Sequence, residues 1–224
     1  MKSLSIIVPV LNEAEHIEAT LGELQRLRER GAEVVVVDGG SSDGTPMLCN
    51  GLADRVIGGP RGRARQMNTG AAESRGDVLL FLHADTLLPK NGARAAVQAV
   101  ADGATWGRFD VHIVGTSIWF PLIGGLMNLR SRITGIATGD QAIFVEREAF
   151  ERIGGYPDQP LMEDVAISHR LRAVARPRCL PLVVRTSGRR WSQAGVLRTV
   201  VLMWRLRWLY WRGVPADELA RAWR

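Results

Sequence analysis

The segment Gly76–Pro89 reads Gly-Asp-Val-Leu-Leu-Phe-Leu-His-Ala-Asp-Thr-Leu-Leu-Pro, and it indicates the fold class of the chain. Val78–Leu82 is an unbroken apolar run too short for a helix, so it predicts a strand buried on both faces of a parallel sheet. The run stops at His83-Ala84-Asp85. Ligands of open α/β sheets bind beyond the carboxyl ends of strands, so Asp85 is a candidate binding residue. The alternative is a turn-forming Asp before a helix that starts at Asn91.

Strands and helices alternate around this segment. Buried strands are predicted at Leu4–Val10, Glu33–Val37 and Arg55–Ile57, and each is followed by a helical pattern. This order predicts an α/β fold of Rossmann-like type, with a mostly parallel twisted sheet and helices on both faces. The second strand also runs into an acid, Asp38, so Asp38 and Asp85 are expected at one edge of the sheet.

Local signals place the ends of several helices. Asn12 with Glu15 three residues later predicts the start of the first helix. The glycine-rich segment Gly39–Pro46 is either an ordinary turn or a site for a phosphate at a helix start. Arg63 and Arg65 lie near the beginning of another helix, where cations oppose the helix dipole. A bound polyanion would offset that penalty.

The second half of the chain is less regular. Thr105–Val114 alternates polar and apolar residues, which predicts a half-exposed strand with Arg108 on its polar side. A short strand is predicted at Ala142–Val145. Glu163 and Asp164 stand in the first turn of a predicted helix, where acids are either favourable partners of the helix dipole or functional groups.

The composition is that of a folded protein. With 224 residues, 46% hydrophobic and 23% charged, the chain can bury a sizeable core. Two cysteines are too few for a disulfide framework or a zinc site, and Met1-Lys2 leads directly into a strand, so we expect a cytoplasmic chain. The window Val111–Leu129 is uncharged and long enough to span a membrane, but its polar, glycine and proline residues favour a strand and an interfacial or buried helix.

The end of the chain carries the excess charge. Residues 185–224 contain nine arginines and two acids, so this segment accounts for the net charge of +6. A long helix is predicted from Ser192 to Arg212, with tryptophans on its apolar side and arginines on another face. Such a helix suits either an anionic membrane surface or packing on the core. Nucleic acid is not expected as a partner, because tryptophans within an apolar stripe would be unavailable to stack on bases.

Several motifs occur in an order that resembles the family 2 inverting glycosyltransferases, which have the A-type nucleotide-diphospho-sugar transferase (GT-A) fold. The resemblance covers residues 3–185, and its specificity comes from the order and spacing of the motifs. These motifs are Pro9-Val10-Leu11-Asn12-Glu13, Val37–Thr45, Asn68-Thr69-Gly70, Gly76-Asp77 with Phe81–Asp85, and Met162-Glu163-Asp164. The chain is similar to a bacterial subset that has His-Ala-Asp in place of Asp-x-Asp.

The resemblance implies a metal-dependent enzyme that moves a sugar from a nucleotide-diphospho-sugar to an acceptor hydroxyl with inversion. Asp164 would be the catalytic base and Asp85 the ligand of a divalent metal ion, Mn²⁺ or Mg²⁺. The implied donor-binding residues are Pro9, Leu11, Glu13, Asp38, Gly62, Arg63, Arg65, His83 and Ala84. The implied acceptor-side residues are Gly139, Asp140, Gln141 and Glu163. Residues 1–188 would form one such domain, with a nucleotide-binding half (1–103) and an acceptor half (104–188), and residues 189–224 a helical tail.

The chain departs from the family pattern at two places. His83 stands where the family usually has the first Asp, and a neutral imidazole is compatible with Mn²⁺ but less suited to Mg²⁺. The usual Gln-x-x-Arg-Trp element is absent, and Arg189-Arg190-Trp191 is its candidate replacement.

Two other functions stay open at this point. A nucleotidyltransferase of related fold would have a glycine-rich basic loop after the first strand, where this chain has Pro9–Glu13. A non-catalytic nucleotide-sugar-binding module on a membrane is suggested by His83 and the basic tail. If Trp119–Ile123 and the tail lie on one face beside the site, a lipid carrier or lipid-linked glycan is the natural acceptor, and the protein would lie on the inner face of the cell membrane.

Overall fold

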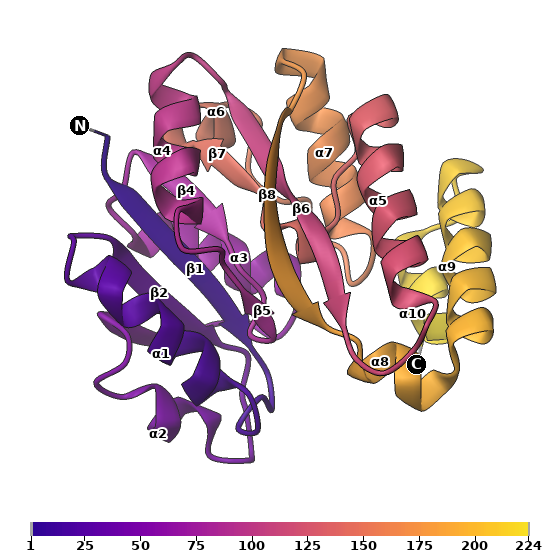
Figure 1. Ribbon diagram of the computed structural model, residues 1–224, viewed down its shortest axis with the longest axis horizontal. Coiled ribbons are helices and arrows are strands. Elements are labelled where there is room, and N and C mark those ends of the chain that lie inside the picture. The colour runs from indigo at the N-terminus through magenta and orange to yellow at the C-terminus, as the bar shows by residue number, and fades with distance from the viewer. Residues whose placement is uncertain (1, 224) are drawn as a thin grey trace.

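The computed structural model describes residues 2–223, with the side chains of Arg190, Ser192 and Gln193 left aside. Its centre is a twisted sheet of eight strands in the order β3-β2-β1-β4-β7-β6-β8-β5, with helices on both faces (Figure 1). The strands are β1 (Leu4–Val10), β2 (Glu33–Asp38), β3 (Arg55–Gly58), β4 (Val78–Phe81), β5 (Thr86–Leu87), β6 (Trp106–Val114), β7 (Phe144–Glu146) and β8 (Arg178–Ser187). The predicted α/β fold class is confirmed.

The helices connect these strands and then form the tail. They are α1 (Ile17–Arg28), α2 (Thr45–Cys49), α3 (Arg63–Glu73), α4 (Gly92–Ala101), α5 (Phe120–Thr134), the 3₁₀ turn η1 (Gly139–Gln141), α6 (Arg147–Arg152), α7 (Glu163–Val174), α8 (Arg189–Ala194), α9 (Val196–Trp211) and α10 (Ala216–Trp223).

The first four strands in chain order pair in parallel, so their carboxyl ends share one edge. β1 pairs with β2 from Ser5↔Glu33 to Val10↔Asp38, and with β4 from Leu4↔Val78 to Ile7↔Phe81. Pro9 lies beyond the residues of β1 that pair with β4, where its missing N–H costs no bond to that strand. The ends of β1, β2 and β4 therefore open together, as the strand order predicts.

The other half of the sheet is mixed. β7 is antiparallel to both β4 and β6, whereas β6 and β8 are parallel. The two-residue strand β5 pairs with the end of β8, and the Ser187 N–H donates to the carbonyl of Asp85 at 3.2 Å. The end of β8, from which the tail departs, therefore lies beside the end of β4.

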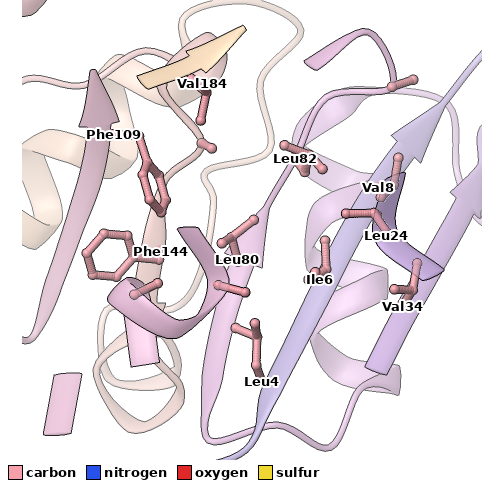
Figure 2. Close-up of a cluster of buried hydrophobic side chains, with 14 of the residues drawn as sticks. Leu4, Ile6, Val8, Leu24, Val34, Leu80, Leu82, Phe109, Phe144 and Val184 are labelled. Carbon is pink, nitrogen blue, oxygen red and sulfur yellow. The ribbon is translucent and has the colours of Figure 1, made fainter. Parts of the chain in front are cut away.

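Two apolar layers hold the sheet between the helices. On one face Ile6 and Val8 of β1 pack with Leu24 of α1 and with Leu80 (Figure 2), and α4 extends this cluster through its alanines. On the other face, Ile7 and neighbouring strand residues pack against α3, α6 and α7. Burial on both faces is the arrangement that the unbroken apolar strands predict.

Three details differ from the predictions. The first helix begins at Ile17, because Asn12 adopts a left-handed backbone (φ +55°) and its side-chain oxygen accepts a hydrogen bond from the Ser42 N–H. The long terminal helix is interrupted at Gly195 (φ +85°), which separates α8 from α9. Arg108 is fully buried rather than half-exposed, because it pairs with Asp110 inside the layer beneath α5.

The tail packs by one side and exposes the other. Leu206 and Leu219 pack against Ile136, Met162 and Val165, so the tail covers the segment that leads into α7. The tryptophans of α9 point outward, and Trp204, Trp208 and Trp211 are 72%, 55% and 78% exposed. Of the two arrangements considered for this helix, packing of its tryptophans on the core is therefore wrong, and so is the reason given against nucleic acid, that these side chains are unavailable. In the described part of the chain, the helices are all too short or too polar to cross a membrane.

Candidate active site

Three segments that are distant in the sequence meet at the open edge of the sheet. They are the residues after β4, the turn η1 and the first turn of α7. The His83 Nδ1 atom lies 3.3 Å from Asp140 Oδ1, and the backbone of Gly139 lies against the His83 ring so closely that a Cβ atom would collide with it. The Gly139 N–H donates to Asp164 Oδ2 at 3.1 Å. A chain of contacts therefore joins His83 to Asp164 through one turn of backbone.

The carboxylate of Asp164 is held by two backbone donors. Its other oxygen accepts from the Val165 N–H at 2.7 Å, so both oxygens are oriented. Burial, followed by the negative charges of Glu163 and Asp140, raises the pKa of Asp164 to about 6, against the lowering effect of the two N–H donors. At neutral pH the group is ionised but is a stronger base than an ordinary carboxylate, which is the property that a general base requires.

Backbone strain sets the direction of these acids. Met162 is buried and adopts a left-handed conformation (φ +62°) immediately before α7, which begins at Glu163. Non-glycine residues in this region cost of the order of 1–3 kcal/mol and persist where the surroundings impose them. The tail supplies part of those surroundings, since Met162 packs in the same cluster as Leu206. The strained residue and the tail thus fix where α7 presents its acids.

Arg63 opposes these carboxylates from the start of α3. Its Nη1 atom lies 3.7 Å from Glu163 Oε1, and Glu163 is only 6% exposed. Burial lowers the pKa of Arg63, but the charges of Glu163, Asp140, Asp164 and Asp85 outweigh it and raise that pKa. Asp85 and Asp164 are therefore both close enough to Arg63 for their charges to raise its pKa. About half of the Arg63 side chain is open to solvent, so the group is accessible to a ligand.

The other residues implied for donor binding are arranged around the ends of β1 and β2. Asp38 accepts hydrogen bonds from the N–H groups of Gly40 and Ser41 and from the Ser41 hydroxyl, so its carboxylate is held at the rim. Arg65 pairs with Asp158 at 2.6 Å, away from the acids that face Arg63. Three further implied residues, Pro9, Gly62 and Ala84, contribute backbone or small apolar surface at this edge: Pro9 and Ala84 are buried and Gly62 precedes α3.

The tail reaches the donor side of the site. Arg189 Nη2 lies 2.6 Å from Glu13 Oε2, which joins α8 to the loop that follows β1. Leu11 and Glu13 are both half-buried in that loop. The structure thus brings the first residue of Arg189-Arg190-Trp191 to the position that the resemblance gives to the nucleotide.

The residues present suit a metal ion that is completed by a ligand. No group of three or more His, Cys, Asp or Glu side chains within residues 2–223 is arranged to hold a metal ion. Asp85 is half-buried and provides a carboxylate beside His83. Mg²⁺ and similar ions are commonly bound by one or two carboxylates, with substrate phosphates and water as the other ligands. Asp85 fits that mode. The described residues do not form a closed cage of protein ligands.

One polar residue near the site, Tyr156, carries no signal in the sequence pattern. Tyr156 is buried against Phe81 and Phe150, and desolvation, followed by the charges of Asp164 and Glu163, raises the pKa of its hydroxyl well above the usual value. Asn68 holds the backbone of Tyr156 through two hydrogen bonds of 2.8 and 2.9 Å. The Asn-Thr-Gly motif therefore anchors the loop before α7, a role that only the tertiary contact reveals.

Comparisons with known proteins agree with this arrangement. The family described as Glycosyl transferase family 2 matches residues 5–154. The succinoglycan biosynthesis protein ExoA of Rhizobium meliloti (strain 1021) is 32% identical over 187 residues, which cover 74% of this chain and 57% of that protein. The chain spans about half the length of the curated relatives it matches.

Two solved structures share the fold. The mannosyltransferase PcManGT from Pyrobaculum calidifontis, in complex with GDP-Man and Mn²⁺, is 26% identical with a TM-score of 0.62, over 82% of this chain and 56% of that one. TarS 1-349 of S. aureus in complex with UDP-GlcNAc is 18% identical with a TM-score of 0.67, over 83% and 58%. The family match covers more than half of the sequence, and the chain therefore belongs to glycosyl transferase family 2.

Proposed function

We propose that this protein transfers a sugar from a nucleotide-diphospho-sugar to an acceptor hydroxyl with inversion of the anomeric configuration. The observation that carries the proposal is the Asp164 carboxylate, oriented by two backbone donors, with a pKa raised to about 6, across from Arg63. The family match and the donor complexes of PcManGT and TarS support the same reaction class.

Asp164 acts on the acceptor. One carboxylate oxygen takes the proton of the acceptor hydroxyl while the hydroxyl oxygen attacks the anomeric carbon, and the bond from that carbon to the diphosphate oxygen breaks on the opposite face. General base catalysis of this kind contributes about 10²–10⁴-fold. Arg63 stabilises the negative charge that develops on the departing diphosphate. A single displacement of this type inverts the anomeric centre.

Charge at the site favours a metal-bound donor. Arg63 faces Asp85, Asp140, Glu163 and Asp164, and these five side chains together carry a formal charge of about −3 before a diphosphate arrives. A divalent ion, Mn²⁺ or Mg²⁺, held by Asp85 would supply positive charge to the diphosphate as it leaves. The Mn²⁺ in the PcManGT complex supports this proposal, and His83 beside Asp85 favours Mn²⁺.

Removal of metal tests that assignment. In calorimetric titrations with a panel of nucleotide sugars, we expect EDTA to weaken binding of the preferred donor at least about tenfold relative to MnCl₂, since the diphosphate would otherwise approach the acids unscreened. The thermal unfolding of the protein without nucleotide should be the same in EDTA and in MnCl₂. Equal donor affinity under both conditions would remove the metal from the proposal.

The transfer itself is tested by product analysis. The preferred nucleotide sugar is incubated with candidate acceptors, and NMR of the product gives the anomeric configuration. An inverted product supports the proposal; a retained configuration, or release of free nucleotide monophosphate, would contradict it and favour a different reaction on this fold.

The acceptor proposal rests on two exposed apolar stripes. α5 exposes Leu122, Leu126, Leu129 and Ile133, and α9 exposes Leu197, Val201 and its tryptophans. The two helices lie side by side at one end of the molecule (Figure 1). Exposed arginines on α9, such as Arg198 and Arg205, complement anionic headgroups. A lipid-linked acceptor at the inner face of the cell membrane is the substrate class that suits this surface.

Vesicle binding tests the membrane proposal. We expect the full chain to co-sediment with anionic vesicles, and the triple variant Leu197→Ser, Val201→Ser, Trp204→Ser to bind at least about tenfold more weakly, because each large apolar side chain that is buried contributes about 1.5–3 kcal/mol. Met47→Ser, at an exposed apolar residue of α2, is the control. Equal binding by the triple variant, or tighter binding of single-stranded oligonucleotide than of vesicles, would contradict the proposal.

A further inference from the structure

A hollow lies between α5, α7 and α9, next to the helix that carries Asp164. It has a volume of about 370 Å³. Ile136 and Val165 give it apolar walls, Arg130 and Arg207 give it cationic groups, and Thr134, His169, Tyr210 and Trp211 complete the lining. None of these lining residues of the described chain is acidic. The hollow is therefore apolar and cationic together.

Two nitrogens of Arg130 lack hydrogen-bond partners among the described residues. Its Nε and Nη2 atoms are buried and form no hydrogen bond with any group that the structure describes. Desolvation lowers the pKa of Arg130, the charge of Asp164 opposes that effect, and the nearby Arg108 adds to it. A buried guanidinium with unpaired donors is costly, and a bound oxyanion is the ligand that satisfies it best.

The hollow adjoins both the catalytic base and the exposed stripes. Val165 lines it and also donates its N–H to Asp164. Trp211 lines it and is at the same time the last exposed tryptophan of α9. The hollow therefore lies beside the residue that follows Asp164 in α7 and beside the exposed end of α9.

We propose that the hollow between α5, α7 and α9 binds an acidic phosphate group of the acceptor, paired with Arg130 and Arg207. This inference rests on the proposed function, because it names the chemical class of the acceptor for the same transfer. The phosphate belongs either to an amphiphile of the lipid-carrier type or to a soluble phosphorylated acceptor. The apolar walls accommodate the first methylenes of an amphiphile.

Calorimetry with three small probes separates these cases. Hexyl phosphate carries both features, hexanol lacks the charge and inorganic phosphate lacks the alkyl chain. We expect the full chain to bind hexyl phosphate, and to bind hexanol far more weakly. Inorganic phosphate binding as tightly as hexyl phosphate identifies a soluble phosphorylated acceptor, and much weaker binding identifies an amphiphile. Hexanol binding as tightly as hexyl phosphate would overturn the proposal.

Matched arginine variants locate the site. Arg130→Gln and Arg207→Gln should each weaken hexyl phosphate binding about ten- to a hundredfold, the equivalent of one charge-assisted hydrogen bond. Arg94→Gln, at an exposed arginine of α4 that does not line the hollow, should bind like the unmodified protein. If Arg130→Gln fails to fold, Arg207→Gln alone decides. Unchanged binding in Arg207→Gln would overturn the proposal.

Measurements of nucleotide-sugar binding distinguish a failure of this inference from a failure of the proposed function. Nucleotide-sugar affinity should be unchanged in the Arg207→Gln variant, because that residue does not face the donor side. Loss of hexyl phosphate binding with intact donor binding and a raised KM for the acceptor assigns the hollow to the acceptor. A protein that binds and transfers from a donor yet ignores hexyl phosphate refutes this inference alone, whereas failure to bind any nucleotide sugar refutes the proposed function.

Discussion

Replacement of Asp164 by Asn should remove activity and increase stability at the same time. Asn has nearly the same shape, and its side-chain oxygen can still accept the hydrogen bond from the Gly139 N–H that the carboxylate accepts at 3.1 Å. It cannot take a proton from an acceptor hydroxyl. We therefore expect turnover to fall about 10²–10⁴-fold while donor binding stays nearly constant.

The expected gain in stability follows from the pKa. Burial raises the pKa of Asp164 from 3.8 to about 6 in the folded protein, so the folded state binds the proton more tightly than the unfolded state. Below about pH 4 the carboxyl group is protonated in both the folded and the unfolded state, so it costs the folded state nothing. The free energy of unfolding then falls as the pH rises from about 4 through 6. The shift corresponds to about 3 kcal/mol at 1.36 kcal/mol per unit, an upper value because the site is partly open to solvent.

Urea unfolding of both proteins between pH 4 and pH 8 measures this difference. The Asn variant should be more stable by about 1–3 kcal/mol at pH 8, and the advantage should disappear near pH 4. Asp102→Asn, at an exposed carboxylate that follows α4, is the control. It should change neither the activity nor the pH dependence of the free energy of unfolding. An Asp164→Asn variant that is less stable than the unmodified protein at pH 8, or that turns over normally, would refute the reasoning.

Two further predictions concern the contacts that assemble the site. Gly139→Ala should lower turnover about 10²-fold, because its Cβ would displace the His83 ring and the N–H that orients Asp164; Gly22→Ala, at an unhindered position of α1, should leave turnover unchanged, and equal rates in the two variants would contradict this account. A double-mutant cycle of Glu13→Gln and Arg189→Gln should give a coupling free energy of about 0.5–1 kcal/mol in urea unfolding, against nearly zero for the more exposed pair Asp158 and Arg65. Equal coupling free energies for the two pairs would show that α8 does not hold the loop that follows β1.

Much of the sheet could be predicted because its central strands are buried on both faces. Val34–Val37 and Val78–Leu82 are apolar without interruption, and this pattern is independent of which helix covers them. The strand Arg178–Ser187 carries no such pattern: it contains a proline, and most of its residues are exposed or half-buried. Its place is set by pairing with β6, which is a tertiary contact.

The remaining misses have particular causes. Asn12 and Glu15 match a helix start, but the Asn12 oxygen binds the Ser42 N–H thirty residues away, and this bond competes with capping. Gly195 is a visible signal for a break, yet glycines within helices, such as Gly22 in α1, are tolerated elsewhere in this chain. Burial of Arg108 required a partner, Asp110, two residues along the same strand and a helix above them.

The candidate site was predicted through the resemblance, and its energetics come from the structure. The sequence places Asp85 and Asp164 in known motifs, but it contains no sign that the Gly139 N–H orients Asp164 or that Met162 is strained. The unpartnered nitrogens of Arg130 are equally invisible, because they depend on three helices closing around one side chain.

These features together explain why the tail matters to the chemistry. α9 packs on Met162 and Val165, the residues on either side of the Glu163-Asp164 pair. α8 holds the loop that follows β1, through the ion pair of Arg189 and Glu13. The same tail supplies Arg207 to the hollow between α5, α7 and α9 and exposes tryptophans beside it. One segment therefore contacts the loop that follows β1, the start of α7 and the proposed acceptor site.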